Sequence, residues 1–116
     1  MIEVNLLNFL KDKIDGVDIL TEMQAKTAPK TYILIEKVGS SRSDHIEYPI
    51  VNFKSVSTTM AKAAALNEQV KQALETLEGY EGIASATINS DYNDTNTATK
   101  EYRYCTVFQF TYYTNY

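Results

Sequence analysis

The chain has 116 residues and a formal net charge of −4. This length fits one ordinary domain, so we interpret residues 1–116 as a single domain with its own core. General binding to nucleic acid or to an anionic membrane needs clustered Lys and Arg. The acidic composition therefore predicts no membrane partner and no direct sequence-specific nucleic acid binding.

The first third of the chain predicts one helix and one short strand. Apolar residues at helical spacing favour a helix over about residues 3–15, with Gly16 as its natural end. The stripe consists of Leu6, Leu7, Leu10 and Ile14. A short alternating strand follows at 17–23, and residues 24–30 form a polar loop in which Pro29 disfavours helical geometry at the preceding residue.

Residues 30–57 indicate a hairpin. Residues 30–38 are the most apolar strand candidate, and residues 39–44, "GSSRSD", are typical of a turn or flexible loop. The second arm spans residues 45–57 and contains Pro49. Proline cannot donate a ladder hydrogen bond, which predicts an edge or a bulge at that point.

The stretch from 57 to 82 contains the strongest helix signal. Its apolar stripe comprises Met60, Ala63, Leu66, Val70, Ala73, Leu74 and Leu77. Ser57, Thr58 or Thr59 can cap its start, and Gly79 can close its end.

The last third predicts a second hairpin, formed by residues 83–91 and 101–114 around a polar loop at 91–100. Alternation in "EYRYCTVFQFTYY" places an aromatic set on one face of the closing strand. The members of that set are Tyr102, Tyr104, Thr106, Phe108, Phe110 and Tyr112, and we expect them to form the floor of the core. The other face carries Arg103, Cys105, Val107, Gln109, Thr111 and Tyr113.

Together these elements predict an α+β fold: a mainly antiparallel sheet of four to five strands with two helices packed on one face. No internal repeat and no second domain are evident. The sheet face opposite the helices is then either exposed to solvent or available for contact with another protein.

Motifs for chemistry are sparse. Cys105 and His45 are the only residues of their kinds, so no internal disulfide can form and they are the one conceivable nucleophile pair. We interpret Cys105 as a small, half-buried strand residue. Asp91 and Asp94 with neighbouring asparagines resemble calcium ligands, but the glycine and closing glutamate of the EF-hand loop are missing. We expect no metal, no cofactor and no enzymatic activity.

The chain resembles a known family in two stretches. They are "PKTYILIEKVGSSRSDHIEYPIVNFKSVSTTMAKAAALNEQVKQAL" and "INSDYNDTNTATKEYRYCTVFQFTYY". Their marks are an alanine-rich helix with "LNE.V", and "SDYN.T.T....YRY" leading into an aromatic strand. Over about residues 29–113 the pattern is similar to tail terminator, or tail completion, proteins of long-tailed bacteriophages and prophages of Gram-positive bacteria.

The resemblance implies an α+β subunit that assembles as a hexameric ring on the tail tube, stops its polymerisation and provides the head-joining surface. Its partners are then further copies of itself, the major tail tube protein and a head-completion or connector protein. The implied location is the head–tail junction of the virion, after synthesis in the host cytoplasm. The family assigns no role to a single position, so candidate interface residues rest on polarity and place alone. They are Arg42, His45, Asp94, Arg103, Gln109 and Tyr113.

Two other functions stay open at this point. One is a small ligand-binding or regulatory domain with a pocket over the aromatic sheet. The other is an enzyme subunit that uses Cys105.

Overall fold

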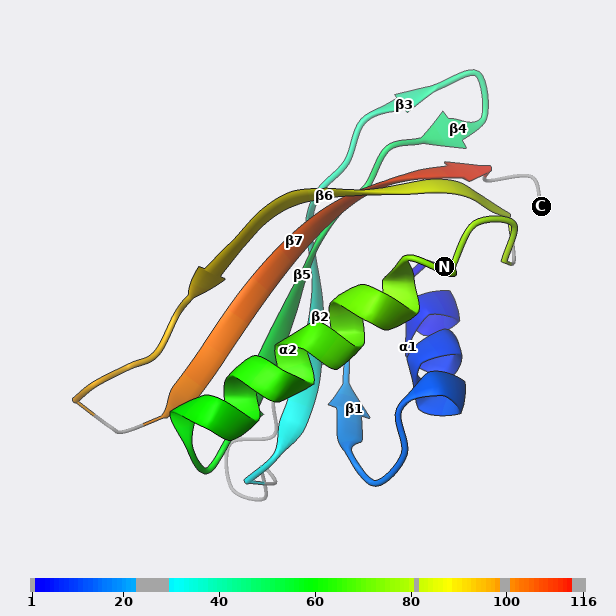
Figure 1. Cartoon of the computed structure of the whole chain (residues 1–116). Coiled ribbons are helices and arrows are strands. Elements are labelled where there is room, and N and C mark those ends of the chain that lie inside the picture. The colour runs from blue at the N-terminus through cyan, green and yellow to red at the C-terminus, as the bar shows by residue number, and fades with distance from the viewer. Residues whose placement is uncertain (1, 23–29, 81, 99–100, 114–116) are drawn as a thin grey trace.

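The computed structural model describes residues 2–22, 30–80, 82–98 and 101–113. Two helices lie on one face of a curved sheet (Figure 1). This arrangement confirms the α+β fold, the mostly antiparallel sheet and the two helices expected from the sequence.

The first helix, α1 (Ile2–Lys13), covers the sheet with Ile2, Leu6, Phe9 and Leu10. Gly16 follows it with φ +74°, a left-handed conformation that glycine adopts without steric cost. The predicted start and stop of this helix are therefore confirmed to within about two residues.

The second helix, α2 (Met60–Leu74), begins at the predicted cap and ends earlier than expected. Thr59 caps it, because its hydroxyl accepts a hydrogen bond from the Lys62 N–H at 3.2 Å. Glu75, not Gly79, is the C-cap residue. The Thr76 hydroxyl donates to the Ala73 carbonyl at 2.8 Å, so a side chain satisfies one of the last carbonyls of the helix.

The sheet has seven strands among the described residues, not four to five. In chain order they are β1 (Asp18–Leu20), β2 (Tyr32–Gly39), β3 (Arg42–Ser43), β4 (Ile46–Glu47), β5 (Ile50–Ser57), β6 (Ile83–Asn93) and β7 (Tyr102–Tyr113). The two additional strands come from the predicted hairpin of residues 30–57. Its expected turn contains β3, and Pro49 divides the expected second arm into β4 and β5.

A bulge lies next to Pro49 on the β2 side, where the pairing with β5 shifts between Lys37 and Gly39, opposite Val51 and Ile50. On the β7 side the pairing is not shifted. Glu47 pairs with Tyr112 and Ile50 with Gln109, so β4 and β5 keep one common register on β7. The Phe110 N–H still donates to the Pro49 carbonyl at 3.0 Å. Proline only removes the reciprocal donor, which interrupts the strand without shifting it.

The strand order is β1-β2-β5-β7-β4-β3, and β6 pairs with the other side of β7. β1 and β2 are parallel, and the other pairs are antiparallel. The predicted hairpin of β6 and β7 is confirmed, although β6 extends to Asn93, into the expected loop. The closing strand is therefore central, which explains its dense aromatic sequence.

The core lies between the helices and the middle of the predicted aromatic face of β7. Thr106, Phe108 and Phe110 are buried as expected, whereas Tyr102, Tyr104 and Tyr112 of the same face are only half-buried. Phe53, Phe108 and Phe110 contact one another, with ring centroids 6.0 to 6.2 Å apart. Each buried Phe side chain contributes roughly 1.5–3 kcal/mol of hydrophobic stabilisation. Leu66, Val70 and Leu74 of α2 belong to the same cluster.

The opposite face of the sheet is partly buried rather than fully exposed to solvent. Cys105 is fully buried rather than half-buried as expected, and Val107 is buried beside it. Nearby, Tyr32, Leu34 and Val56 form a second small apolar cluster.

Candidate interaction surface

The six candidate residues lie in two groups at opposite ends of the sheet, with one residue between them. Arg42, His45 and Tyr113 lie at or beside the β3–β4 hairpin, and Asp94 and Arg103 lie near the β6–β7 connection. Arg103 and Tyr113 are ten positions apart along β7, a distance of about 33 Å. The principal extents of the molecule, 45 × 25 × 25 Å, agree with two separated ends.

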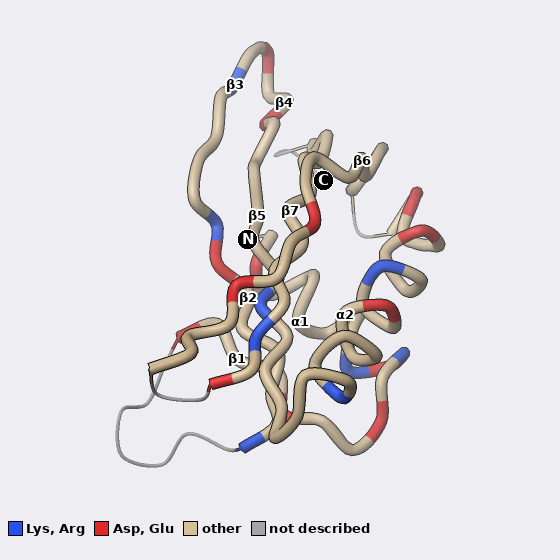
Figure 2. Tube along the Cα trace, turned by 60° about the vertical axis from the view of Figure 1, so that its left-hand side comes forward, with Lys and Arg blue, Asp and Glu red and all other residues tan. Residues whose placement is uncertain are grey.

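Residues 40–47, which we call the arm, extend beyond the helices (Figure 1), and Figure 2 shows both signs of charge along them. The sequence predicted a turn or flexible loop at 39–44, whereas Arg42 and Ser43 form β3 and pair with β4. Asp44 and His45 make the turn with φ values of 49° and 66°. Two consecutive left-handed residues are the geometry of a type I′ hairpin turn, which normally favours Asn-Gly.

An ion cluster fixes the base of the arm. Glu47 is buried and accepts from the Arg42 guanidinium at 3.0 Å and from the Lys37 ammonium at 3.2 Å. Burial raises the pKa of the Glu47 carboxyl, but hydrogen bonds and positive charge from Arg42 and Lys37 outweigh it, so the pKa lies below its ordinary value. Two cations around one carboxylate leave this cluster net positive at neutral pH.

Arg103 holds together the end of the sheet at the β6–β7 connection. Its guanidinium bonds Asp94 at 3.0 Å and Glu101 at 2.8 Å, so two candidate residues, Arg103 and Asp94, are direct partners. The Thr95 hydroxyl accepts from the Arg103 N–H at 3.1 Å. Arg103 therefore ties the start of β7 to the end of β6.

Gln109 and Tyr113 share the helix-free face of β7. Gln109 is exposed between Ile50 and Thr87 on the neighbouring strands. Tyr113 is exposed and pairs with Ile46 of β4, at the base of the arm.

Sequence reasoning missed a polar connection between α2 and β6. The Asn67 amide donates to Asp91 at 2.7 Å, and the Lys71 ammonium bonds both Asp91 and Glu68 at 2.5 Å. The hydrogen bonds that Lys71 donates to Asp91 and Glu68 raise its pKa above the ordinary value. Asn67 lies in the apolar stripe of α2, and that polar interruption was the available signal.

Two features bear on the calcium hypothesis and the thiol hypothesis: ion pairs at the two carboxylates, and burial of the thiol. Asp91 pairs with Lys71 and Asp94 with Arg103, so each carboxylate already has a cation. No group of three His, Cys, Asp or Glu with metal-site geometry occurs within the described ranges. Burial raises the pKa of the Cys105 thiol, which disfavours the reactive thiolate. His45, the single histidine, lies at the arm tip, far along the sheet from Cys105.

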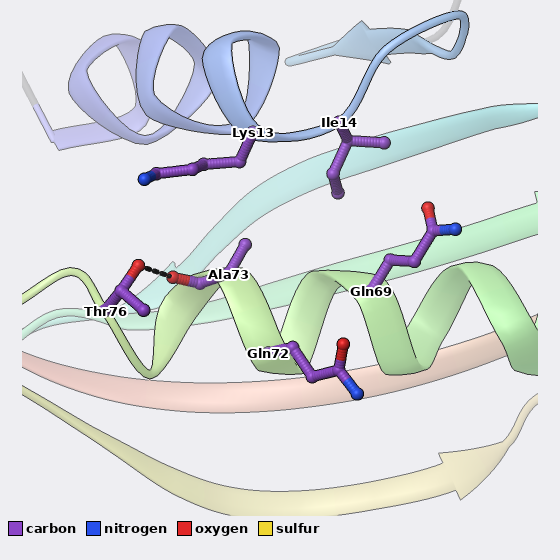
Figure 3. Close-up of a pocket in the computed structure, with 6 residues that line it drawn as sticks. All are labelled: Lys13, Ile14, Gln69, Gln72, Ala73 and Thr76. Carbon is purple, nitrogen blue, oxygen red and sulfur yellow. Dashed lines mark hydrogen bonds between the residues drawn. The ribbon is translucent and has the colours of Figure 1, made fainter.

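Surface depressions lined by described residues accompany these elements, and three of them bear on the site. One of about 280 Å³ lies between the end of α1 and α2, where Lys13 and Ile14 face Gln69, Ala73 and Thr76 (Figure 3). A second, about 280 Å³, lies beside β6 and reaches Ile88 and Phe108. A third, about 400 Å³, lies beside β2 and reaches Ile35 and Lys37.

Within the part of the chain that the structure describes, neither helix has the length and hydropathy needed to cross a membrane. Comparison with models of known protein families found no match, and neither did a search of curated proteins.

Proposed function

We propose that this protein is a structural, non-enzymatic virion protein that caps the tail tube of a long-tailed phage or prophage. It terminates polymerisation of the tube and provides the head-joining surface, as a hexameric ring at the head–tail junction. The proposal begins from the sequence resemblance over residues 29–113. Its partners are other copies of the chain, the major tail tube protein and a head-completion or connector protein.

One structural observation supports this proposal most directly. Polar groups gather at two ends of an elongated subunit: the exposed arm at one end, and the half-buried ion pair of Asp94 and Arg103 at the other. A ring at a junction must contact a tube on one side and a connector on the other, which requires two separate contact regions. A single binding site for a small molecule would have no need of that separation.

Electron microscopy of tails made without this protein tests the proposal. We expect tails of uncontrolled length that carry no heads, and we expect the wild-type chain supplied in trans to restore tails of fixed length joined to heads. Tails of normal length joined to heads in its absence would contradict the proposal.

A second candidate function rests on the depression beside β6. Phe108 of the aromatic sheet face contributes to its lining, with Ile88 and Ala86, as a pocket over that sheet would require. A ligand-binding domain of this kind should be a monomer or dimer whose melting temperature rises when a small apolar molecule is added. A terminator should instead form larger assemblies in solution or on the tube.

A further inference from the structure

We infer that two copies of this chain join edge to edge, with the free edge of β2 in one copy added to the free edge of β6 in the next. This inference specifies the contact within the proposed ring and in that sense rests on the proposed function. The geometry behind it is independent of what the ring caps.

The first open edge belongs to β2. β1 pairs with β2 only at Tyr32, Ile33 and Leu34, and no described strand pairs with the outer side of β2 beyond that point. This free edge carries Val38, which is 57% exposed and lies at the bulge between Lys37 and Gly39. The depression lined by Ile35 and Lys37 opens beside it. Unpaired backbone groups next to exposed apolar surface form a template for another strand.

The second open edge belongs to β6, whose described pairing is with β7 alone. It carries Ile88, which is 49% exposed. The depression lined by Ile88 and Phe108 lies between this edge and α2. An extended segment that adds to a sheet edge places alternate side chains into such a recess, which is how strand addition gains specificity.

The two free edges lie at the same height on opposite sides of the sheet. Across the strands, Lys37 pairs with Val51, Val51 with Phe108, and Phe108 with Ile88. A sideways repeat of the subunit therefore brings β2 of one copy level with β6 of the other.

The strand directions also agree. β2 is antiparallel to β5, β5 to β7, and β7 to β6, so β2 and β6 run in opposite directions. The new pair is therefore antiparallel and extends the sheet without reversing its direction pattern.

Ion clusters near the two edges have opposite net charge. Beside β2, Arg42 and Lys37 surround one carboxylate, and the Arg42 side chain is 63% exposed. Beside β6, Glu68 and Asp91 surround Lys71, and the Glu68 side chain is 60% exposed. Arg42 and Lys37 thus give the arm end of the β2 side a surplus positive charge, whereas Glu3, Glu22 and Glu36 line the depression beside that strand. Charge therefore favours contact of the β6 side with the arm end of β2, and the mixture of variants below separates this contact from an edge meeting its own copy.

A contact between different edges is head-to-tail, so each subunit offers one of each edge and repetition closes a ring or extends a filament. This property gives a sharp test. Val38→Asp blocks the β2 edge and Ile88→Asp blocks the β6 edge, since burying an unpaired carboxylate in the contact is unfavourable. Both side chains are exposed, so neither change should alter the fold.

The experiment measures mass by analytical ultracentrifugation over a range of concentrations. We expect the wild-type chain to form larger species as concentration rises, and each variant to associate at least about tenfold more weakly, a loss that reflects the desolvated charge. An equimolar mixture of the two variants should form dimers and stop there, because one intact edge of each kind remains. Gln72→Asp, an exposed change on α2 away from both edges, is the matched control and should associate like wild type.

Each other outcome overturns the inference. A wild-type chain that stays monomeric at its highest soluble concentration contradicts edge pairing. Val38→Asp that associates like wild type shows that the β2 edge is not used. A mixture that forms no dimers, with both variants melting like wild type, excludes a head-to-tail contact. If either variant melts early, the lysine replacement at the same position takes its place under the same criteria.

The two proposals fail separately. If the edge variants do not pair in solution but tail length in the phage is still controlled, the chain caps the tube through a different interface. If the chain pairs in solution but its removal does not change tail length, the edge contact is supported and the capping function is contradicted.

Discussion

Phe108 and Gln109 are adjacent residues with opposite environments. Phe108 packs against Phe53 and Phe110 beneath the helices, whereas Gln109 is exposed on the other face. We expect Phe108→Ala to lower the free energy of unfolding by about 3–5 kcal/mol, from lost burial and the cavity left behind. Gln109→Ala should change it by no more than about 0.5 kcal/mol. Denaturant unfolding measures both, and equal small losses would contradict the strand register.

Cys105 and Tyr92 form a pair of weak acids across β6 and β7. Burial raises the pKa of the Cys105 thiol, and the hydrogen bond to Cys105 raises the pKa of Tyr92 to about 12. The folded chain therefore keeps both protons at a pH where the unfolded chain releases them. The free energy of unfolding should fall as pH rises from about 8.5, the ordinary value for a thiol, towards 12.

Two substitutions test this pair. Cys105→Ser should remove the part of the slope that begins near the ordinary thiol value, and it should also reduce the part due to Tyr92, whose pKa is raised by its contact with Cys105. Tyr92→Phe should reduce the slope above pH 10 or so, where Tyr32 and Lys71, whose pKa values are also raised, contribute the rest. We expect Cys105→Ser to cost about 1–3 kcal/mol by burying a hydroxyl, yet to leave self-association unchanged. Denaturant melts across the alkaline range measure the slope. Loss of head joining in a serine variant with normal fold and mass would instead assign the thiol a chemical role.

Residue environments were predictable only where one local pattern decides them. Alternation along β7 correctly placed Phe108 and Phe110 in the core. The same pattern could not show that Cys105 is fully buried, because this depends on neighbours from β5 and β6 that lie far away in sequence. The partners of Arg103 likewise follow from the β6–β7 register.

At the scale of elements, the arm is the least ordinary feature. Its turn places two non-glycine residues, Asp44 and His45, in the left-handed region. This conformation costs roughly 1–2 kcal/mol for each ordinary residue, somewhat less for Asp and His. Strain of this kind persists where the side chains serve a contact.

Replacing Asp44-His45 by Asn-Gly tests that idea. Asn-Gly is the preferred sequence for this turn, so the melting temperature should stay equal or rise slightly. If the side chains make a contact, tail completion in the phage should weaken although the fold is more stable. Ser43→Ala, an exposed change in the adjoining strand β3, is the matched control. Full tail completion by the Asn-Gly variant would assign the turn a connecting role only.

Elements with a long periodic pattern were predictable, and short ones were not. α2 has four turns of apolar stripe and a Thr cap, so its face and its start were identified correctly. β3 and β4 are each two residues long, which is too short to show an alternating pattern of apolar and polar residues. Their turn also lacks the glycine that usually marks a hairpin, because Gly39 lies at the end of β2 instead.

At the scale of the whole molecule, the central place of β7 connects the two ends. Its first residues pair with the end of β6 beside Asp94, and its last residues pair with β4 in the arm. A rigid strand through the core thus holds the two candidate contact regions at a fixed separation. The sequence identified the polar residues but not their division into two groups, because that division depends on strand order.

If the two ends meet different partners, their variants should fail at different steps of virion assembly. His45→Ala removes an exposed side chain at the arm tip, and Thr97→Ala removes one at the far end, near Asp94. Neither side chain belongs to the core, so both variants should fold. Thr97→Ala should melt like wild type, whereas His45→Ala should melt slightly lower, because alanine tolerates the left-handed backbone at position 45 less well than histidine. We expect one to give tails of uncontrolled length and the other to give tails of normal length without heads, because capping the tube and joining the head are separate contacts. Electron microscopy of lysates that carry each variant scores both defects, and the same defect from both ends would show that one partner spans the subunit.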